Sequence, residues 1–297
     1  MYHLDKIILG DNQFFGVNHL SSERGIAREI HFQDVSNVIQ VMEWALEFGA
    51  GGVMLSTHPR VGQICEAMKA NPRLRDNMNI YANIPYIAKY VREANENGIM
   101  GLLSDISSRI SMGDKIKMAL RGGKNLIKKD FLELFKVLID IEMAYFSGLN
   151  VKAVFLHNVL VDIALGLDTR DVFEFFADYI AKRYNALPGF GTLNLPMLIT
   201  KLNNCGVTNA LVMASFNKKG LYMNPSRESY EQIVSKYDFR LLANGVLASG
   251  ALKPKDAFDY LFSHKPDASV IIGASSKSHL EESIDLLKVH YDSKRMV

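Results

Sequence analysis

The stretch Val270-Ile271-Ile272-Gly273-Ala274-Ser275-Ser276 places consecutive apolar residues directly before a glycine and two serines. It continues into Lys277-Ser278-His279-Leu280-Glu281-Glu282-Ser283, which has the character of a helix N-terminus. An unbroken apolar, β-branched run is typical of a parallel strand that is covered on both faces. The stretch therefore predicts a buried strand, a polar turn and a helix.

The same strand-then-helix unit recurs along the rest of the chain. Short aliphatic runs predict strands at Lys6–Leu9, Gly52–Ser56, Asn79–Ile84, Val151–His157, Leu187–Leu193, Thr208–Ser215, Phe239–Ala243 and Ser269–Ile272. Amphipathic runs between them predict helices at residues 34–49 (capped by Asp34 and ended by Gly49), 60–70, 86–97, 130–146, 169–184, 195–203, 227–236, 256–262 and 278–290.

Eight successive βα units predict an α/β fold, a single-domain (β/α)8 TIM barrel over residues 1–297. A doubly wound open sheet is the alternative. Such a sheet usually carries fewer strands and a glycine-rich turn after the first, whereas here Gly10 is followed by Asp11-Asn12-Gln13.

Two segments are longer than a minimal barrel needs: residues 16–33 after the first strand, and residues 100–129 between the third and fourth strands. The second carries Arg109, Lys115, Lys117, Arg121, Lys124, Lys128 and Lys129. This basic run is consistent with a solvated helical face or with a lid that brings positive charge to an anionic ligand.

Composition excludes several classes of protein. Of 297 residues, 34 are Lys or Arg and 32 are Asp or Glu, a net charge of +2, which does not favour nucleic acid or a membrane as a partner. Two cysteines exclude a disulfide framework and a Cys-rich zinc site. The N-terminus does not resemble a secretory signal, and no long apolar run is present. We expect a soluble cytoplasmic protein with a small-molecule substrate, and the composition leaves a homo-oligomer open.

In a TIM barrel the active site lies at the carboxyl ends of the strands. The residues that follow the strands here are rich in amides, hydroxyls and histidines, and the catalytic candidates among them are Asp11, His58, Asn83, Tyr86 and His157. Asp11 is a potential general base, or an Asx turn with Asn12; His157 is a pocket residue or a core histidine. Because carboxylates are scarce at these positions, no metal site is expected.

The turn after the last strand is a candidate anion site. Free backbone N–H groups and the helix dipole favour negative charge at Gly273, Ala274, Ser275, Ser276 and Lys277. The alternative is that a serine only caps the last helix.

Further polar residues are candidate contacts for an anionic or phosphorylated substrate: Asn12, Gln13, Asn158, Asn217, Lys218 and Lys219. The two lysines alternatively form a Schiff base or lie in a solvated loop, and their polar neighbours favour exposure over the burial that a Schiff-base lysine needs.

The last βα unit, residues 270–287, resembles the cofactor loop of aldo-keto reductases. Several other segments resemble that family in the same order: Leu9-Gly10 with Phe15-Gly16, Trp44 to Thr57, Phe131 to His157, Gly191-Thr192-Leu193-Asn194, and Leu242 to Leu252. The resemblance implies NADP or NAD as the cofactor, with Asn194 and Ser249 among its contacts. Lys277, as the nearby cation, favours NADP.

The resemblance also shows a departure from the family. Its reductases use an Asp, a Tyr, a Lys and a His, and only the His has a match, at His157. The Asp position falls near Leu55 or Ser56, the Tyr position near His58 or Arg60, and the Lys position near 83–85. His58 or Tyr86 is a candidate replacement acid. We therefore expect an aldo-keto-reductase-like oxidoreductase with an atypical site; the alternatives are a lyase, aldolase or isomerase on a phosphorylated molecule, or a non-catalytic ligand-binding barrel.

Overall fold

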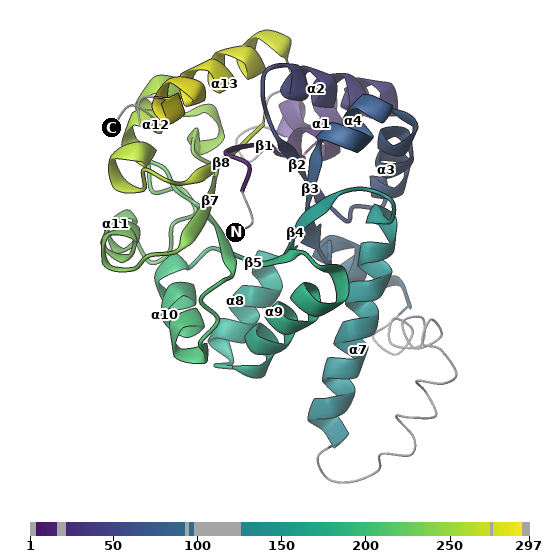
Figure 1. The fold of residues 1–297 in the computed structure, drawn as a ribbon, viewed down its shortest axis with the longest axis vertical. Coiled ribbons are helices and arrows are strands. Elements are labelled where there is room, and N and C mark those ends of the chain that lie inside the picture. Colours follow the sequence, from purple (N-terminus) through teal and green to yellow (C-terminus); the bar gives the residue numbers. More distant parts are fainter. Residues whose placement is uncertain (1–3, 17–21, 93–94, 98–125, 274–275, 293–297) are drawn as a thin grey trace.

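The computed structural model describes residues 4–16, 22–92, 95–97, 126–273 and 276–292. Eight parallel strands close into a barrel in sequence order, with β1 beside β8. Figure 1 shows this ring of strands with the helices around it. The strands are β1 (Ile7–Leu9), β2 (Gly52–Ser56), β3 (Asn79–Ile84), β4 (Val151–Leu156), β5 (Leu187–Thr192), β6 (Leu211–Ser215), β7 (Arg240–Asn244) and β8 (Ser269–Ile272).

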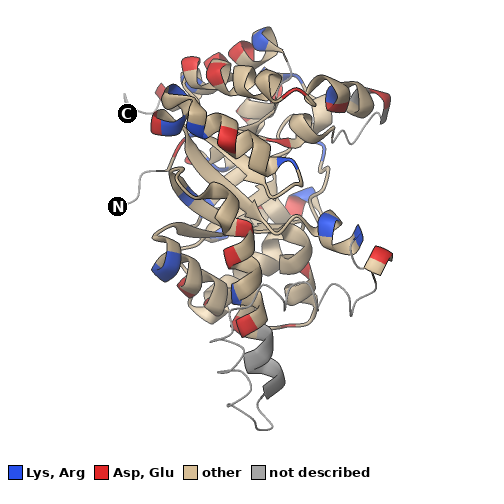
Figure 2. Ribbon diagram, turned by 90° about the vertical axis from the view of Figure 1, so that its right-hand side faces the viewer, with Lys and Arg blue, Asp and Glu red and all other residues tan. Residues whose placement is uncertain are grey.

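Helices surround the barrel and cover the outward faces of its strands (Figure 1). They are α1 (Ser22–His31), α2 (Val35–Glu47), α3 (Val61–Ala70), α4 (Pro72–Asn77), α7 (Leu126–Met143), α8 (Asn158–Gly166), α9 (Asp171–Tyr184), α10 (Leu195–Cys205), α11 (Arg227–Lys236), α12 (Pro254–His264) and α13 (Lys277–Asp292). Short 3₁₀ turns are η1 (Asn12–Phe15), η2 (Ala144–Phe146) and η3 (Ala248–Gly250). Basic and acidic residues are interspersed over the ribbon in Figure 2.

Alternation along the strands divides the core in two. Side chains such as Val53, Ala82 and Val212 point outward and pack under the helices. Side chains such as Met54, Tyr81 and Phe155 point inward and fill the barrel as a separate apolar cluster. Gly189 leaves room for the Phe155 ring, since a Cβ at Gly189 would lie 2.5 Å from it. The barrel interior is therefore a packed core and not a channel.

A polar cluster lies where the strands begin, at the end of the barrel opposite its candidate site. The Tyr81 hydroxyl donates to Asp5 Oδ2 at 2.7 Å and accepts from the Asp5 backbone N–H at 3.0 Å. Asn79 also donates to this carboxylate, at 2.7 Å, and Lys152 lies 3.4 Å from it. These contacts tie the N-terminal segment to β3 and β4.

The predicted (β/α)8 barrel and its eight strands are confirmed: β2, β3 and β8 have the predicted bounds, and the bounds of the other five differ by one to three residues. Among the α-helices given above for the described residues, three were not predicted. α4 begins at Pro72, which ends α3 and then occupies the first turn of a new helix capped by Asn71. α8 begins one residue after the β4 strand region, and its apolar composition does not separate it from the strand. α1 forms within the predicted loop of residues 16–33.

Most of the second long segment, residues 98–125, lies outside the described residues, so both explanations of its basic run stay predictions. Its described end is the start of α7. Among the helices that the structure describes, none combines the length and the apolarity that crossing a membrane requires.

Candidate active site

A polar ring lies above the apolar interior at the carboxyl ends of the strands. Side chains two residues apart on a strand point to the same face. Ser56 lies two residues after inward-facing Met54, and Asn83 lies two residues after inward-facing Tyr81, so both point inward. On the other side of the barrel, Ser215 and Asn244 follow inward-facing residues of β6 and β7 in the same way. The barrel therefore changes from apolar to polar at its mouth.

Asp11 supplies a carboxyl group beside this ring. Its side chain is only 6% exposed, and its Oδ2 accepts the backbone N–H of Ser56 at 2.6 Å. Burial raises the pKa of Asp11 to about 6, and the hydrogen bonds from Ser56 offset only part of that effect. A carboxyl group with such a pKa can take up or release a proton near neutral pH.

His58 forms an aromatic cluster with Phe15 and Tyr86, and the charge of Asp11 acts on Tyr86. The His58 ring stacks on Phe15, with centroids 4.1 Å apart, and contacts Tyr86 edge to face at 5.0 Å. Burial, with the nearby charge of Arg60, lowers the pKa of His58 to about 4, so the imidazole is neutral at pH 7. Burial and then the Asp11 charge raise the pKa of Tyr86, which keeps its hydroxyl protonated.

Arg60 fixes the loop that carries Asp11. Its guanidinium donates to the carbonyl of Phe14 at 3.3 Å, to the carbonyl of Gln33 at 3.1 Å, and to the carbonyl of Phe32. These carbonyls lie on either side of α1. Arg60 therefore holds η1 and the α1–α2 connection against the start of α3.

His157 ends β4 and caps α8. Its Nδ1 accepts the backbone N–H of Val159 at 3.3 Å, and the His157 backbone N–H donates to the Ile84 carbonyl at 2.8 Å. Burial lowers the pKa of His157, which keeps the ring neutral. Asn158, the first residue of α8, approaches β5 closely: its backbone nitrogen would lie 3.3 Å from a Cβ at Gly191.

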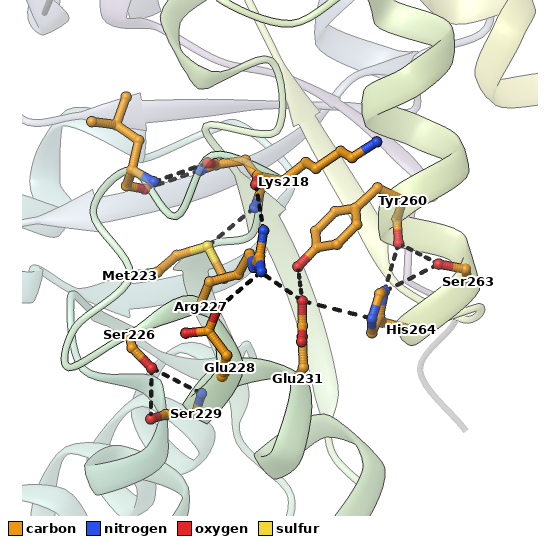
Figure 3. Close-up of polar contacts among 12 residues, drawn as sticks. Lys218, Met223, Ser226, Arg227, Glu228, Ser229, Glu231, Tyr260, Ser263 and His264 are labelled. Carbon is orange, nitrogen blue, oxygen red and sulfur yellow. Dashed lines mark hydrogen bonds and ion pairs between the residues drawn. The ribbon is translucent and has the colours of Figure 1, made fainter.

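The candidates on the β5 and β6 loops have mostly local contacts. Asn194 caps α10 by accepting the backbone N–H of Met197 at 3.2 Å. Asn217 is fully buried and exchanges two hydrogen bonds with the Leu221 backbone, which closes its own loop. Lys218 and Lys219 are exposed. In Figure 3, the Lys218 backbone accepts from Arg227, which also belongs to the α11 network of Glu228 and Glu231.

The turn after β8 lies against the β1 loop. Gln13 is buried, and its Nε2 donates to the Gly10 carbonyl at 2.6 Å. A Cβ at Gly273 would lie 2.6 Å from Gln13 Oε1, so this approach depends on glycine. Asn12, next to Gln13, is exposed.

The other candidates of the cofactor loop are spread around this turn. The Ser276 hydroxyl is buried before α13 and has no hydrogen-bond partner among the described residues. The Lys277 ammonium lies 5.6 Å from the Phe48 ring centroid and 4.0 Å from Glu47. Ser249 is an exposed residue of η3 with φ of 59°. Ala274 and Ser275 lie outside the described residues.

The structure thus brings Asp11, Asn83, His58 and Tyr86 together, and it shows three participants that were not selected as site residues: Ser56, Ser215 and Asn244. Alternation along β2, β6 and β7 could have identified these three residues. Each lies two positions after an inward-facing apolar residue, so its side chain also points inward, at the end of the apolar core. Within the described ranges there is no group of three or more His, Cys, Asp or Glu residues that could hold a metal ion.

The fold and the polar mouth define a TIM barrel with its candidate site at the carboxyl ends of the strands. No protein-family model and no curated protein matches the chain. Among solved structures it resembles aldose reductase from Giardia lamblia, with a TM-score of 0.54 and 10% identity over 97% of this chain and 88% of that one.

Two further structures extend this similarity. An aldo-keto reductase from Bacillus halodurans, in its holo form, gives a TM-score of 0.53 at 11% identity over 96% of this chain and 87% of that one. A mutant protein solved in complex with NADPH gives a TM-score of 0.50 at 9% identity over 95% of this chain and 83% of that one. The chain therefore has the barrel fold of aldo-keto reductases, as its sequence segments predict.

Proposed function

We propose that this protein is an NADP- or NAD-dependent oxidoreductase that interconverts a small carbonyl compound and its alcohol at the barrel mouth. The observation that carries the proposal is the buried Asp11 carboxyl group, with a pKa of about 6, bonded to the backbone of Ser56. Ser56 lies where the family resemblance places the reductases' aspartate. In this chain the carboxyl group comes from the β1 loop instead of β2.

The side chains around Asp11 have complementary roles in this proposal. Asp11 accepts the proton of the substrate alcohol in oxidation and returns it in reduction. Tyr86, protonated at neutral pH, and the neutral His58 and His157 orient the substrate oxygen by hydrogen bonding. Phe15, stacked on His58, restricts access of water to that side.

The residues near the β8 turn fit a dinucleotide phosphate. The buried Ser276 hydroxyl lacks a partner among the described residues, and it lies before a 16-residue helix whose N-terminus favours an anion. Gly273 and Ser276 would hold the phosphates together with the neighbouring Ala274 and Ser275, and Asn194, Ser249 and Lys277 are proposed as outer contacts. When bound, a nicotinamide cofactor supplies or accepts the hydride. The proposed location of the protein is the cytoplasm, and its proposed substrate is a free small molecule.

Fluorescence titration with NADPH tests the cofactor site. We expect saturable binding by the wild type and its loss in Gly273→Glu, because the new side chain displaces Gln13 and brings a carboxylate against the phosphates. The matched control is Gly166→Glu, since Gly166 ends α8 and has no atom within 4 Å of an added Cβ. Equal binding by both variants, or none by the wild type, would contradict the proposal.

Turnover on a panel of small aldehydes and ketones tests the reaction. Asp11→Asn should lower kcat by about 100-fold or more, because it removes the acid–base group while keeping the shape of the side chain. A protein that binds NADPH but reduces no carbonyl compound would instead be a ligand-binding barrel.

A further inference from the structure

The polar ring contains two Ser–Asn pairs on opposite sides of the barrel. Ser56 of β2 is in register with Asn83 of β3, and Ser215 of β6 is in register with Asn244 of β7. The strands β2 and β3 lie four positions from β6 and β7 in a closed ring of eight, so the pairs face each other across the mouth.

The two pairs have opposite hydrogen-bond directions. Asn83 Nδ2 donates to Ser56 Oγ at 3.3 Å, which leaves Asn83 Oδ1 buried without a partner among the described residues. Ser215 Oγ donates to Asn244 Oδ1 at 3.1 Å, and no hydrogen bond from Asn244 Nδ2 is found in the described part of the chain. One side thus presents a free acceptor, and the other presents a free donor.

The orientation of the Asn83 amide follows from its neighbours. The Asp11 carboxyl group accepts the backbone N–H of Ser56, and Ser56 Oγ accepts from Asn83 Nδ2. The nitrogen of the Asn83 amide therefore faces Ser56, and its oxygen is buried on the other side of the amide group. Asn83 is 8% exposed, and a buried amide oxygen without a partner is costly unless a ligand supplies a donor.

We propose that these two pairs form the floor of the substrate site and select an uncharged ligand that carries both a hydroxyl group and a carbonyl or second hydroxyl group. This inference rests on the proposed function, of which it names the substrate class. A ligand hydroxyl donates to Asn83 Oδ1, and a ligand oxygen accepts from Asn244 Nδ2. A carboxylate or phosphate is disfavoured at Asn83, because it would bring a second acceptor against the amide oxygen and the nearby Asp11 carboxyl group.

Ligand-observed NMR titration without any cofactor tests the floor separately from the reaction. The probes are dihydroxyacetone, acetone and glycolate, three small molecules that differ in hydroxyl content and charge. We expect dihydroxyacetone to bind about tenfold more tightly than either of the others, which corresponds to one good hydrogen bond. Asn83→Leu and Asn244→Leu should each abolish that preference, while Asn77→Leu, an exposed position at the end of α4, should keep it.

A second variant guards against misfolding of Asn83→Leu. Asn83→Asp keeps an acceptor at this position, so it should keep the preference over acetone and weaken glycolate further. The inference is overturned if glycolate or acetone binds as tightly as dihydroxyacetone, if the preference survives in both leucine variants, or if dihydroxyacetone does not bind. Failure of the oxidoreductase proposal would appear separately, as an absence of NADPH binding or turnover.

Discussion

At the scale of the residue, Asp11 is held at the barrel mouth at a cost to folding. Burial raises its pKa to about 6 from the ordinary 3.8. The folded chain therefore binds this proton more tightly than the unfolded chain. That contribution to stability is complete below about pH 3.8 and is lost as the pH rises through about 6.

Asp11→Asn should consequently raise the free energy of unfolding at pH 7 by an amount on the order of 2 kcal/mol, because a neutral amide avoids the desolvated charge. The gain should disappear at pH 4, where Asp11 is protonated in the folded protein. Urea denaturation at both pH values measures this difference. Equal effects of the substitution at pH 4 and pH 7 would show that the carboxyl group does not titrate as inferred.

The contact between Gln13 and Gly273 is a second feature of this scale. Gly273→Ala should destabilise the protein by about 1 to 3 kcal/mol, since its Cβ would lie 2.6 Å from the hydrogen-bonded Gln13 amide. Gln13→Ala removes the clash, so the double variant should be more stable than the sum of the two single effects predicts. Thermal unfolding of all three variants gives the coupling, and strict additivity would refute this contact.

At the scale of the element, the loop that carries Asp11 depends on a side chain of another element. Arg60 makes three hydrogen bonds to backbone carbonyls of η1 and of the α1–α2 connection. The planar guanidinium spans these acceptors, which a lysine ammonium cannot do.

Arg60→Lys should therefore increase amide hydrogen exchange in residues 11–16 and 22–33 while leaving β4 to β8 unchanged. We expect a loss of about 1 to 3 kcal/mol in local opening free energy, the usual range for hydrogen bonds to a charged group. Hydrogen exchange followed by mass spectrometry resolves the two regions. An increase spread over the whole barrel would indicate global destabilisation and contradict a local role.

At the scale of the whole molecule, the two ends of the barrel separate stability from chemistry. The Asp5–Tyr81 cluster closes the end where the strands begin, while the polar ring lies where they end. Tyr81 is fully buried inside the barrel between them.

Tyr81→Phe should lower the unfolding free energy by about 1 to 2 kcal/mol, because the Asp5 carboxylate and backbone N–H each lose a partner. NADPH affinity and turnover should stay within about twofold of the wild type. Denaturation and fluorescence titration on the same preparation test both statements. A large change in NADPH affinity would show that the two ends are coupled.

The sequence alone predicted the eight strands and the closed barrel that they form. Apolar runs such as residues 7–9 and 270–272 are typical of parallel strands covered on both sides, and eight βα units close most readily as a barrel. α8 escaped prediction because hydrophobic periodicity does not distinguish a buried helix that directly follows an apolar strand.

The sequence also determined which residues stand at the strand ends, including Asp11, Asn83 and His157. Only the tertiary structure decided their chemistry. The Asp11 carboxyl group accepts the backbone N–H of Ser56, which lies 45 positions away in the sequence. Asn83 Nδ2 donates to Ser56 Oγ, which leaves Asn83 Oδ1 without a partner among the described residues. Burial and hydrogen-bond direction arise from closure of the barrel, which brings residues distant in sequence into one polar ring, and local sequence patterns do not encode them.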